Sequence, residues 1–205
     1  MQIAVTADLH LRSKQEYPER YSALANILAQ LASQDIDMLL VAGDLFDANL
    51  VDYSDFEQLC DQYPNIQLHI IPGNHDALIS EDKVVGANIH IYTEPKVLVV
   101  DSATFLLIPY DPKVTMGEKL AHAAADIEER QWILVGHGDY MECTKATSTT
   151  EPGVYMPLSR TDLERYAPTT VILGHIHRAQ TNNNVHYVGS PQGLDITETG
   201  RRTYT

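Results

Sequence analysis

Hydrophobic positions along the chain follow two alternating patterns. Short, nearly continuous apolar runs are typical of buried strands, and apolar residues that recur every three or four positions are typical of amphipathic helices. Strands are expected over residues 2–7, 37–43, 66–71, 131–136 and 169–174. Helices are expected over residues 19–34, 54–63, 115–129 and 159–166. This alternation predicts sheets that are covered on both faces.

The centre and the end of the chain depart from this alternation. Residues 88–109 contain three successive strand patterns with no helical pattern between them, and residues 184–190 predict a further strand. Residues 195–205 favour a hairpin that turns at Thr199–Gly200. Residues 138–157 have no periodicity, which is typical of a functional or disordered loop. We therefore predict a mixed α/β sandwich in which sheet packs on sheet and helices lie outside.

Length and composition fit a single globular domain over residues 1–205. The chain is 44% hydrophobic and 20% charged, and no apolar run approaches the roughly 18 residues that a membrane span needs. The first ten residues lack the basic and apolar regions of a signal peptide. Cys60 and Cys143 are the only cysteines, which favours free thiols in a reducing compartment. The expected location is cytoplasmic, with no membrane partner.

The formal net charge of −14 changes the expected range of substrates. Proteins that bind nucleic acid through their whole surface usually carry a basic surplus, because contacts to phosphate supply much of the affinity. The chain therefore acts on a small substrate, or phosphate is attracted by a charge that the residue count omits. A bound metal ion would be such a charge.

Five of the expected strands end in side chains that can bind a metal or move a proton. These side chains are Asp8, His10, Asp44, Asn74, His75, His137, His175 and His177. Five of the nine histidines are among them. Because ligands bind outside the carboxyl ends of strands in open α/β sheets, the five strand ends are predicted to converge on one site.

The residue types at these ends fit two divalent metal ions. Carboxylate, amide oxygen and imidazole are ligands that Mn, Fe and Zn accept. Asp8 with His10, and His175 with His177, are separated by one residue, so both members of each pair can face one site in extended backbone. Only Asp8 and Asp44 are anionic among the ligands, so two divalent ions would leave the site locally positive and attractive to phosphate.

Structural explanations exist for each residue taken alone. A single histidine at a strand end is more often structural, and this interpretation is kept for His69, His90, His122 and His186. A single Gly-Asp pair is usually a turn, and Asp76 fits a cap of the turn that follows it. The five endings, each with a suitable ligand type, favour the functional interpretation.

The order of the motifs resembles the calcineurin-like metallophosphoesterase family. The motifs are D-x-H at 8–10, G-D at 43–44, G-N-H-D at 73–76, G-H at 136–137 and G-H-x-H at 174–177. The resemblance spans nearly the whole chain. It implies a two-sheet sandwich flanked by helices, the four-layer α-β-β-α fold, and an enzyme that hydrolyses phosphoesters.

The resemblance also implies a role for each motif residue. Two divalent ions are expected, with Mn favoured and Fe or Zn as alternatives. The first would be held by Asp8, His10, Asp44 and His177. The second would be completed by Asn74, His137 and His175, with Asp44 bridging. A hydroxide that bridges the metals would attack phosphorus, His75 would protonate the leaving oxygen, and Asp47 would orient His75. A helix-start or turn role for Asp47 is an equal alternative.

Within the family, the segments "TADLHL", "AGDLFD", "IPGNHD" and "VGSPQGLD" are most similar to the SbcD-type DNA exonuclease branch. That likeness implies DNA as substrate and an SbcC-like ATPase subunit as partner. The chain shows no room for the cap domain of that branch and no evident basic stripe, so we expect a catalytic domain only. The alternative is a phosphatase or phosphodiesterase for small nucleotide-like substrates. A non-catalytic scaffold is disfavoured because no ligand position is missing.

Overall fold

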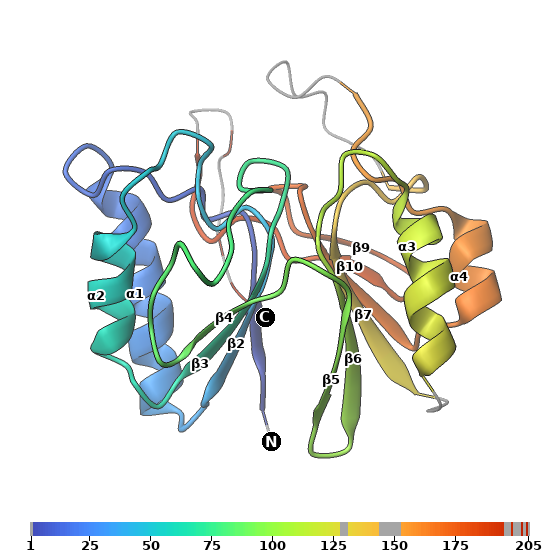
Figure 1. The fold of residues 1–205 in the computed structure, drawn as a ribbon, viewed down its shortest axis with the longest axis horizontal. Helices are drawn as coiled ribbons and strands as arrows, with labels where there is room; N and C mark the ends of the chain where they lie inside the picture. Colours follow the sequence, from blue (N-terminus) through green and yellow to red (C-terminus); the bar gives the residue numbers. More distant parts are fainter. Residues whose placement is uncertain are drawn as a thin grey trace.

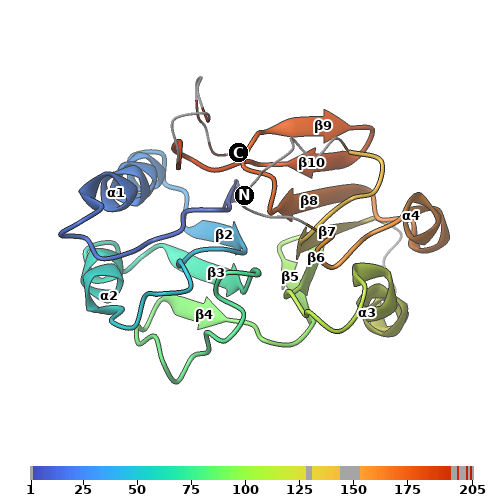
Figure 2. The same cartoon turned by 90° about the horizontal axis from the view of Figure 1, so that it is seen from above.

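The fold of the chain has four layers. A computed structural model describes residues 2–127, 131–143 and 153–194, together with residues 198, 202 and 204. Two sheets lie face to face, with α1 and α2 outside one sheet and α3 and α4 outside the other (Figures 1 and 2). The predicted sandwich with helices outside is therefore confirmed.

The first sheet contains four parallel strands in the order β1-β2-β3-β4. The strands are β1 (Ala4–Thr6), β2 (Met38–Ala42), β3 (Gln67–Ile71) and β4 (Ile89–Ile91). Its helices are α1 (Pro18–Ser33) and α2 (Ser54–Asp61). Pro18 begins α1, where the missing backbone N–H would have had no partner within the helix.

The second sheet contains six strands in the order β5-β6-β7-β8-β10-β9. The strands are β5 (Lys96–Val100), β6 (Ala103–Ile108), β7 (Trp132–His137), β8 (Thr170–Gly174), β9 (Gln180–Asn182) and β10 (Val185–Tyr187). Pairing is parallel from β6 to β10 and antiparallel at both edges. Its helices are α3 (Met116–Ala123), which continues as the 3-10 turn Ala124–Asp126, and α4 (Arg160–Tyr166).

Strand β2 illustrates how the sheets separate three apolar layers. Leu39 and Val41 pack in the layer that contains α1 and α2. Met38, Leu40 and Ala42 point the other way, into the layer between the two sheets. Because successive side chains of a strand point to opposite faces, a continuous apolar run buries both faces of the first sheet. The carboxyl ends of the strands then meet along one edge of the sandwich.

Two elements differ from the sequence-based prediction. The helix expected over 115–129 ends at Ala123, and after the 3-10 turn Ile127 is already extended, with φ −95° and ψ 112°. Strand β9 was not predicted, because its three residues are polar. It pairs with β10 across a turn in which Asn183 has a φ of 53°.

Parts of three predictions lie outside the described residues. These are residues 128–129 of the predicted helix, residues 144–152 of the predicted loop and the hairpin turn at Thr199–Gly200. The described ends of that loop are fastened together, since the Asp139 amide donates to the Tyr155 carbonyl at 2.8 Å. Among the described helices, none combines the length and the apolar character needed to cross a membrane.

Candidate metal centre

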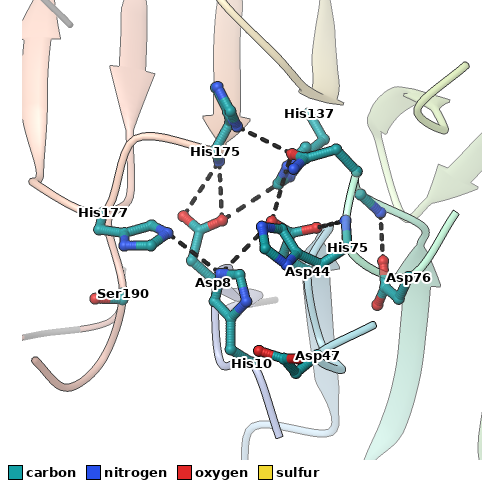
Figure 3. Close-up of polar contacts among 12 residues, drawn as sticks. Asp8, His10, Asp44, Asp47, His75, Asp76, His137, His175, His177 and Ser190 are labelled. Atoms are coloured by element: carbon teal, nitrogen blue, oxygen red, sulfur yellow. Dashed lines mark hydrogen bonds and ion pairs between the residues drawn. The ribbon is translucent and has the colours of Figure 1, made fainter. Parts of the chain in front are cut away.

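The structure brings the seven predicted metal ligands to one place, and Figure 3 labels all of them except Asn74. Four come from the carboxyl ends of β1, β2 and β3 in the first sheet, and three from the ends of β7 and β8 in the second. They are Asp8, His10, Asp44, Asn74, His137, His175 and His177, and polar contacts connect every one of them to another. The predicted convergence of five strand ends is therefore what the structure shows.

The backbone at this edge adopts conformations that are rare for residues with a side chain. Asp8, His10, Asp44 and His175 have φ values of 55°, 46°, 51° and 92°. A left-handed conformation at a residue other than glycine costs about 1–3 kcal/mol and is concentrated at functional sites. Four such residues within one cluster indicate that the chain is held in the geometry that the cluster requires.

Glycine allows the two sheets to approach each other beside the cluster. A Cβ atom on Gly174 would lie 2.1 Å from the carbonyl oxygen of Ala42, and one on Gly43 would lie 2.1 Å from His137 Nδ1. Neither position can accept a side chain without moving the other sheet. The glycines before Asp44 and His175 therefore permit the close contact between sheets that the cluster needs.

One part of the cluster is built around His10. Its Nε2 lies 3.2 Å from His177 Nε2 and 3.5 Å from Asp44 Oδ2. Asp8, His10 and His177 offer ligand atoms that all lie within 4.8 Å of one another. The Asp8 carboxylate is fixed by the backbone amide of His175, which donates to its two oxygens at 2.9 and 3.2 Å.

The other part is built around Asn74. Its Oδ1 lies 2.9 Å from His137 Nε2 and 3.0 Å from His175 Nδ1. The far nitrogen of His137, Nδ1, lies 2.9 Å from the carbonyl oxygen of Ala42. A carbonyl oxygen can only accept, so His137 carries a hydrogen on Nδ1 and turns Nε2 towards the cluster.

Asp44 lies between the two parts. Its Oδ1 accepts a hydrogen bond of 2.8 Å from the His75 amide. Its Oδ2 is buried, lies 3.3 Å from His137 Nε2, and has no hydrogen-bond partner among the described residues. A buried carboxylate oxygen without a donor is costly unless a cation compensates it. Together with the carboxylate of Asp8, the amide oxygen of Asn74 and four imidazoles, this oxygen fits a centre for divalent metals.

Burial is the largest single influence on the pKa values of the cluster. It raises the pKa of Asp8 to about 6, although the charges of His177 and His137 oppose it. It lowers the pKa of His10 to about 3, although Asp44 opposes it. For His137 burial is outweighed by Asp44, Asp8 and the Ala42 carbonyl together, which raise the pKa to about 10. Without metal, the buried carboxylates of the cluster can be neutralised only by the few protons that its histidines hold. Bound cations would neutralise these carboxylates directly.

The two predicted catalytic residues lie beside His10. The ring of His75 is half-buried and stands edge-on to the ring of His10, with centroids 4.5 Å apart. His75 also forms a group within ligand distance with His10 and Asp44, so its role as acid comes from the family resemblance alone. Asp47 is buried and forms an ion pair of 2.9 Å with Arg12. Its predicted role in orienting His75 stays a prediction.

Asp76 fastens a turn, although a different one from the turn expected. Its Oδ1 accepts from the Gly73 amide at 2.6 Å, and its Oδ2 accepts from the Phe46 amide at 3.1 Å. It therefore ties the turn that precedes it to the loop after β2. Burial, together with the charge of Asp44, raises its pKa to about 7.

Two acidic residues near the cluster were missed in the sequence. Asp139 Oδ1 lies 3.6 Å from His175 Nε2, while its Oδ2 accepts from the Tyr155 amide at 2.8 Å. Glu198 Oε1 lies 2.6 Å from His177 Nδ1. The place of Asp139 two residues after His137 was an available signal. Glu198 lies in the hairpin expected over residues 195–205, where nothing in the sequence marks it as a neighbour of His177.

The chain belongs to the calcineurin-like phosphoesterase family, whose sequence model matches residues 1–179. It is therefore a hydrolase of the metallophosphoesterase class. The matched region contains every residue of the five motifs and all seven predicted ligands.

Individual relatives agree with this assignment. The chain is 26% identical to an uncharacterized metallophosphoesterase, YhaO, of Bacillus subtilis (strain 168), over 97% of this chain and 55% of YhaO. It is 28% identical to the SbcD subunit of nuclease SbcCD from the same organism, over 98% of this chain and 64% of that relative. The chain thus spans roughly half to two thirds of each relative. TT1561 of Thermus thermophilus shares the fold, with a TM-score of 0.58, 13% identity, and coverage of 92% of this chain and 88% of that one.

Proposed function

We propose that this hydrolase cleaves phosphodiester bonds at a centre of two divalent ions, with manganese as the favoured metal. The observation that carries the proposal is the buried Oδ2 of Asp44, which lies between His10 and His137 and has no hydrogen-bond partner among the described residues. An oxygen in that position suits a carboxylate that two ions share. Asp8, His10 and His177 would complete one site, and Asn74, His137 and His175 the other.

The reaction assigns separate tasks to the residues around the centre. When bound, divalent ions would activate a water molecule and neutralise charge on the phosphate. The hydrogen bond from the His75 amide orients Asp44, and the amide of His175 orients Asp8. The ring of His75 is half-buried at the edge of the cluster, where it could donate a proton to the leaving oxygen. Such a proton would stabilise the leaving alkoxide as it departs.

Within the diesters, we favour DNA. Support comes from the relative named as the SbcD subunit of nuclease SbcCD, which matches 98% of this chain. The net charge of −14 argues that the metal centre, rather than the protein surface, attracts the phosphate backbone. A basic partner, such as an SbcC-like ATPase subunit, would then be needed for tight binding of long DNA.

The same charge favours the second candidate, a phosphatase or phosphodiesterase for small nucleotide-like substrates. A small substrate needs no extended basic surface, because the metal centre can supply most of the attraction. The two candidates therefore differ in the length of substrate that the protein can use.

The test is hydrolysis with Mn²⁺ of short single-stranded and double-stranded DNA, bis-p-nitrophenyl phosphate and p-nitrophenyl phosphate. We expect cleavage of the diester and of short single strands or ends, with a steep loss of DNA cleavage as salt rises. Strong hydrolysis of the monoester with no cleavage of any DNA would favour the small-substrate candidate. Absence of hydrolysis of all four substrates would reject both.

A further inference from the structure

A polar network beyond residue 179, where the family match ends, surrounds His177. It consists of Ser190, Glu198 and Arg202, and Figure 3 shows Ser190 near His177. None of these residues belongs to the five ligand motifs. The network forms hydrogen bonds to both the ring and the backbone of His177, so it holds the whole residue and does not only pack against it.

Glu198 contacts the nitrogen of His177 that points away from the cluster. Its Oε1 lies 2.6 Å from His177 Nδ1, while His177 Nε2 lies 3.2 Å from His10 Nε2 inside the cluster. A carboxylate accepts, so the short contact places a hydrogen on Nδ1 and leaves the Nε2 lone pair for a metal.

Glu198 is itself held on its other oxygen. Its Oε2 accepts from the Leu194 amide at 3.0 Å and from Arg202 at 3.3 Å. Arg202 also donates to the carbonyl oxygen of His177 at 2.7 Å and to Ser190 Oγ at 2.9 Å. One guanidinium thus connects the carboxylate behind the ring to the backbone of the same histidine.

The Gly-Ser pair before Pro191 completes this arrangement. The Ser190 amide donates to the carbonyl oxygen of His177 at 3.0 Å. Gly189 has a φ of 71°, and a Cβ there would lie 2.9 Å from that carbonyl oxygen. The approach of this segment to His177 therefore requires glycine, which gives a physical reason for the glycine in the segment "VGSPQGLD".

We infer that Glu198 is a positioning residue that fixes the tautomer and the orientation of His177, with Arg202 holding Glu198 in place. His177 needs this support because its ring is only half-buried, whereas the fully buried His137 is oriented by the Ala42 carbonyl. Groups behind a ligand typically contribute 10–100-fold to metal affinity. The effect of Glu198 on the tautomer of His177 does not depend on the proposed function. Only the statement that His177 binds a metal ion rests on it.

The experiment compares Glu198→Ala and Glu198→Gln with Glu94→Gln, a control at a carboxylate that is 82% exposed. The tautomer of His177 is read in the metal-free protein from side-chain ¹⁵N–¹H spectra, with the signal assigned by loss in His177→Gln. Binding of Mn²⁺ is measured by calorimetry on the same samples. Circular dichroism verifies that each variant is folded.

We expect Nδ1–H on His177 in the wild type and in Glu94→Gln, and its loss in Glu198→Ala. One of the two manganese sites should weaken about 10–100-fold in Glu198→Ala while the other is unchanged, and Glu198→Gln should lie between. If Glu198→Ala does not fold, a folded Glu198→Gln with wild-type tautomer and affinity overturns the inference. Wild-type values in folded Glu198→Ala also overturn it. If wild-type protein binds no Mn²⁺ but Glu198→Ala still loses the Nδ1–H of His177, the proposed function is rejected and the inference about Glu198 stands.

Discussion

The two sheets contribute unlike groups to the same cluster. The first sheet supplies Asp8, His10, Asp44 and Asn74, and the second supplies His137, His175 and His177. Both anionic groups come from the first sheet and are oriented by backbone amides. The second sheet supplies imidazole rings, whose outer nitrogens face the Ala42 carbonyl, Asp139 and Glu198. A carboxylate offers a lone pair in any case, whereas an imidazole must first have its hydrogen placed on the other nitrogen.

The largest effect should follow from removing the shared anion of the first sheet. Asp44→Asn is expected to lose both metal ions, whereas His177→Gln, on the second sheet, should lose one. The activity of Asp44→Asn on bis-p-nitrophenyl phosphate should fall by more than the roughly 10–100-fold typical of a residue that only supports a ligand. Metal content after dialysis, measured by mass spectrometry, checks the stoichiometry.

The matched control for Asp44→Asn is Asp61→Asn, the same change at an exposed carboxylate in α2. It should retain two ions and wild-type activity. The comparison between sheets fails if Asp44→Asn keeps one full equivalent of metal, because the Asp44 carboxylate would then serve a single site.

The next largest effect is expected for His75. It tests whether every polar side chain at the carboxyl end of the first sheet acts as a metal ligand. His75→Ala should leave metal binding nearly intact and lower turnover by about 10²–10⁴-fold, because a proton donor is lost. Metal titration is measured side by side with turnover on short single-stranded DNA, whose leaving group is an alkoxide that needs the proton. Metal loss as complete as in Asp44→Asn would show that His75 is a ligand.

The residues of the cluster could be predicted to lie together because each follows an apolar strand run that the sequence shows. "MLLVAGD" and "WILVGH" reveal both the strand and the group at its end. The same reasoning gave the two sheets, since β2 and β7 are too apolar to lie at a surface. The periodicity of apolar residues and the residue that follows a strand are both features of a short segment. Such features can be recognised in a single sequence.

The supporting groups could not be predicted, because their roles depend on contacts between distant residues. Glu198 contacts His177, which lies 21 residues earlier in the sequence, and no pattern in the segment around Glu198 indicates this contact. Strand β9 is polar and exists because β10 offers an edge with which it can pair. The end of α3 at Ala123 has no glycine or proline to announce it, since three alanines occupy residues 123–125.

A smaller effect concerns the contact between the sheets. Gly174→Ala places a Cβ 2.1 Å from the Ala42 carbonyl, a backbone atom of the other sheet. We expect a loss of about 1–3 kcal/mol or more in the free energy of unfolding, because the sheets must separate. Urea denaturation with a chelator present measures this without a contribution from metal binding.

Gly136→Ala is the matched control on the same sheet. Its Cβ would lie 2.9 Å from the sulfur of Met116, near the end of a flexible side chain that can move aside. The loss should therefore be smaller than for Gly174→Ala. Equal losses would show that the approach of the two sheets at Ala42 imposes no special constraint.

The smallest effect concerns His69, a histidine of the first sheet that is not a predicted ligand. Burial, aided by the nearby charge of His90, lowers the pKa of His69 from 6.5 to about 4. Between those values the unfolded chain binds more protons than the folded one, so the contribution of His69 to stability is complete above pH 6.5 and is lost as the pH falls towards 4. His69→Gln should therefore flatten the dependence of unfolding free energy on pH in that window, measured by urea denaturation with a chelator. Tyr92→Phe removes the 2.8 Å contact to His69 Nδ1 but leaves the ring buried, and it should keep the wild-type slope. A flattened slope in Tyr92→Phe alone would assign the effect to the hydrogen bond instead of burial.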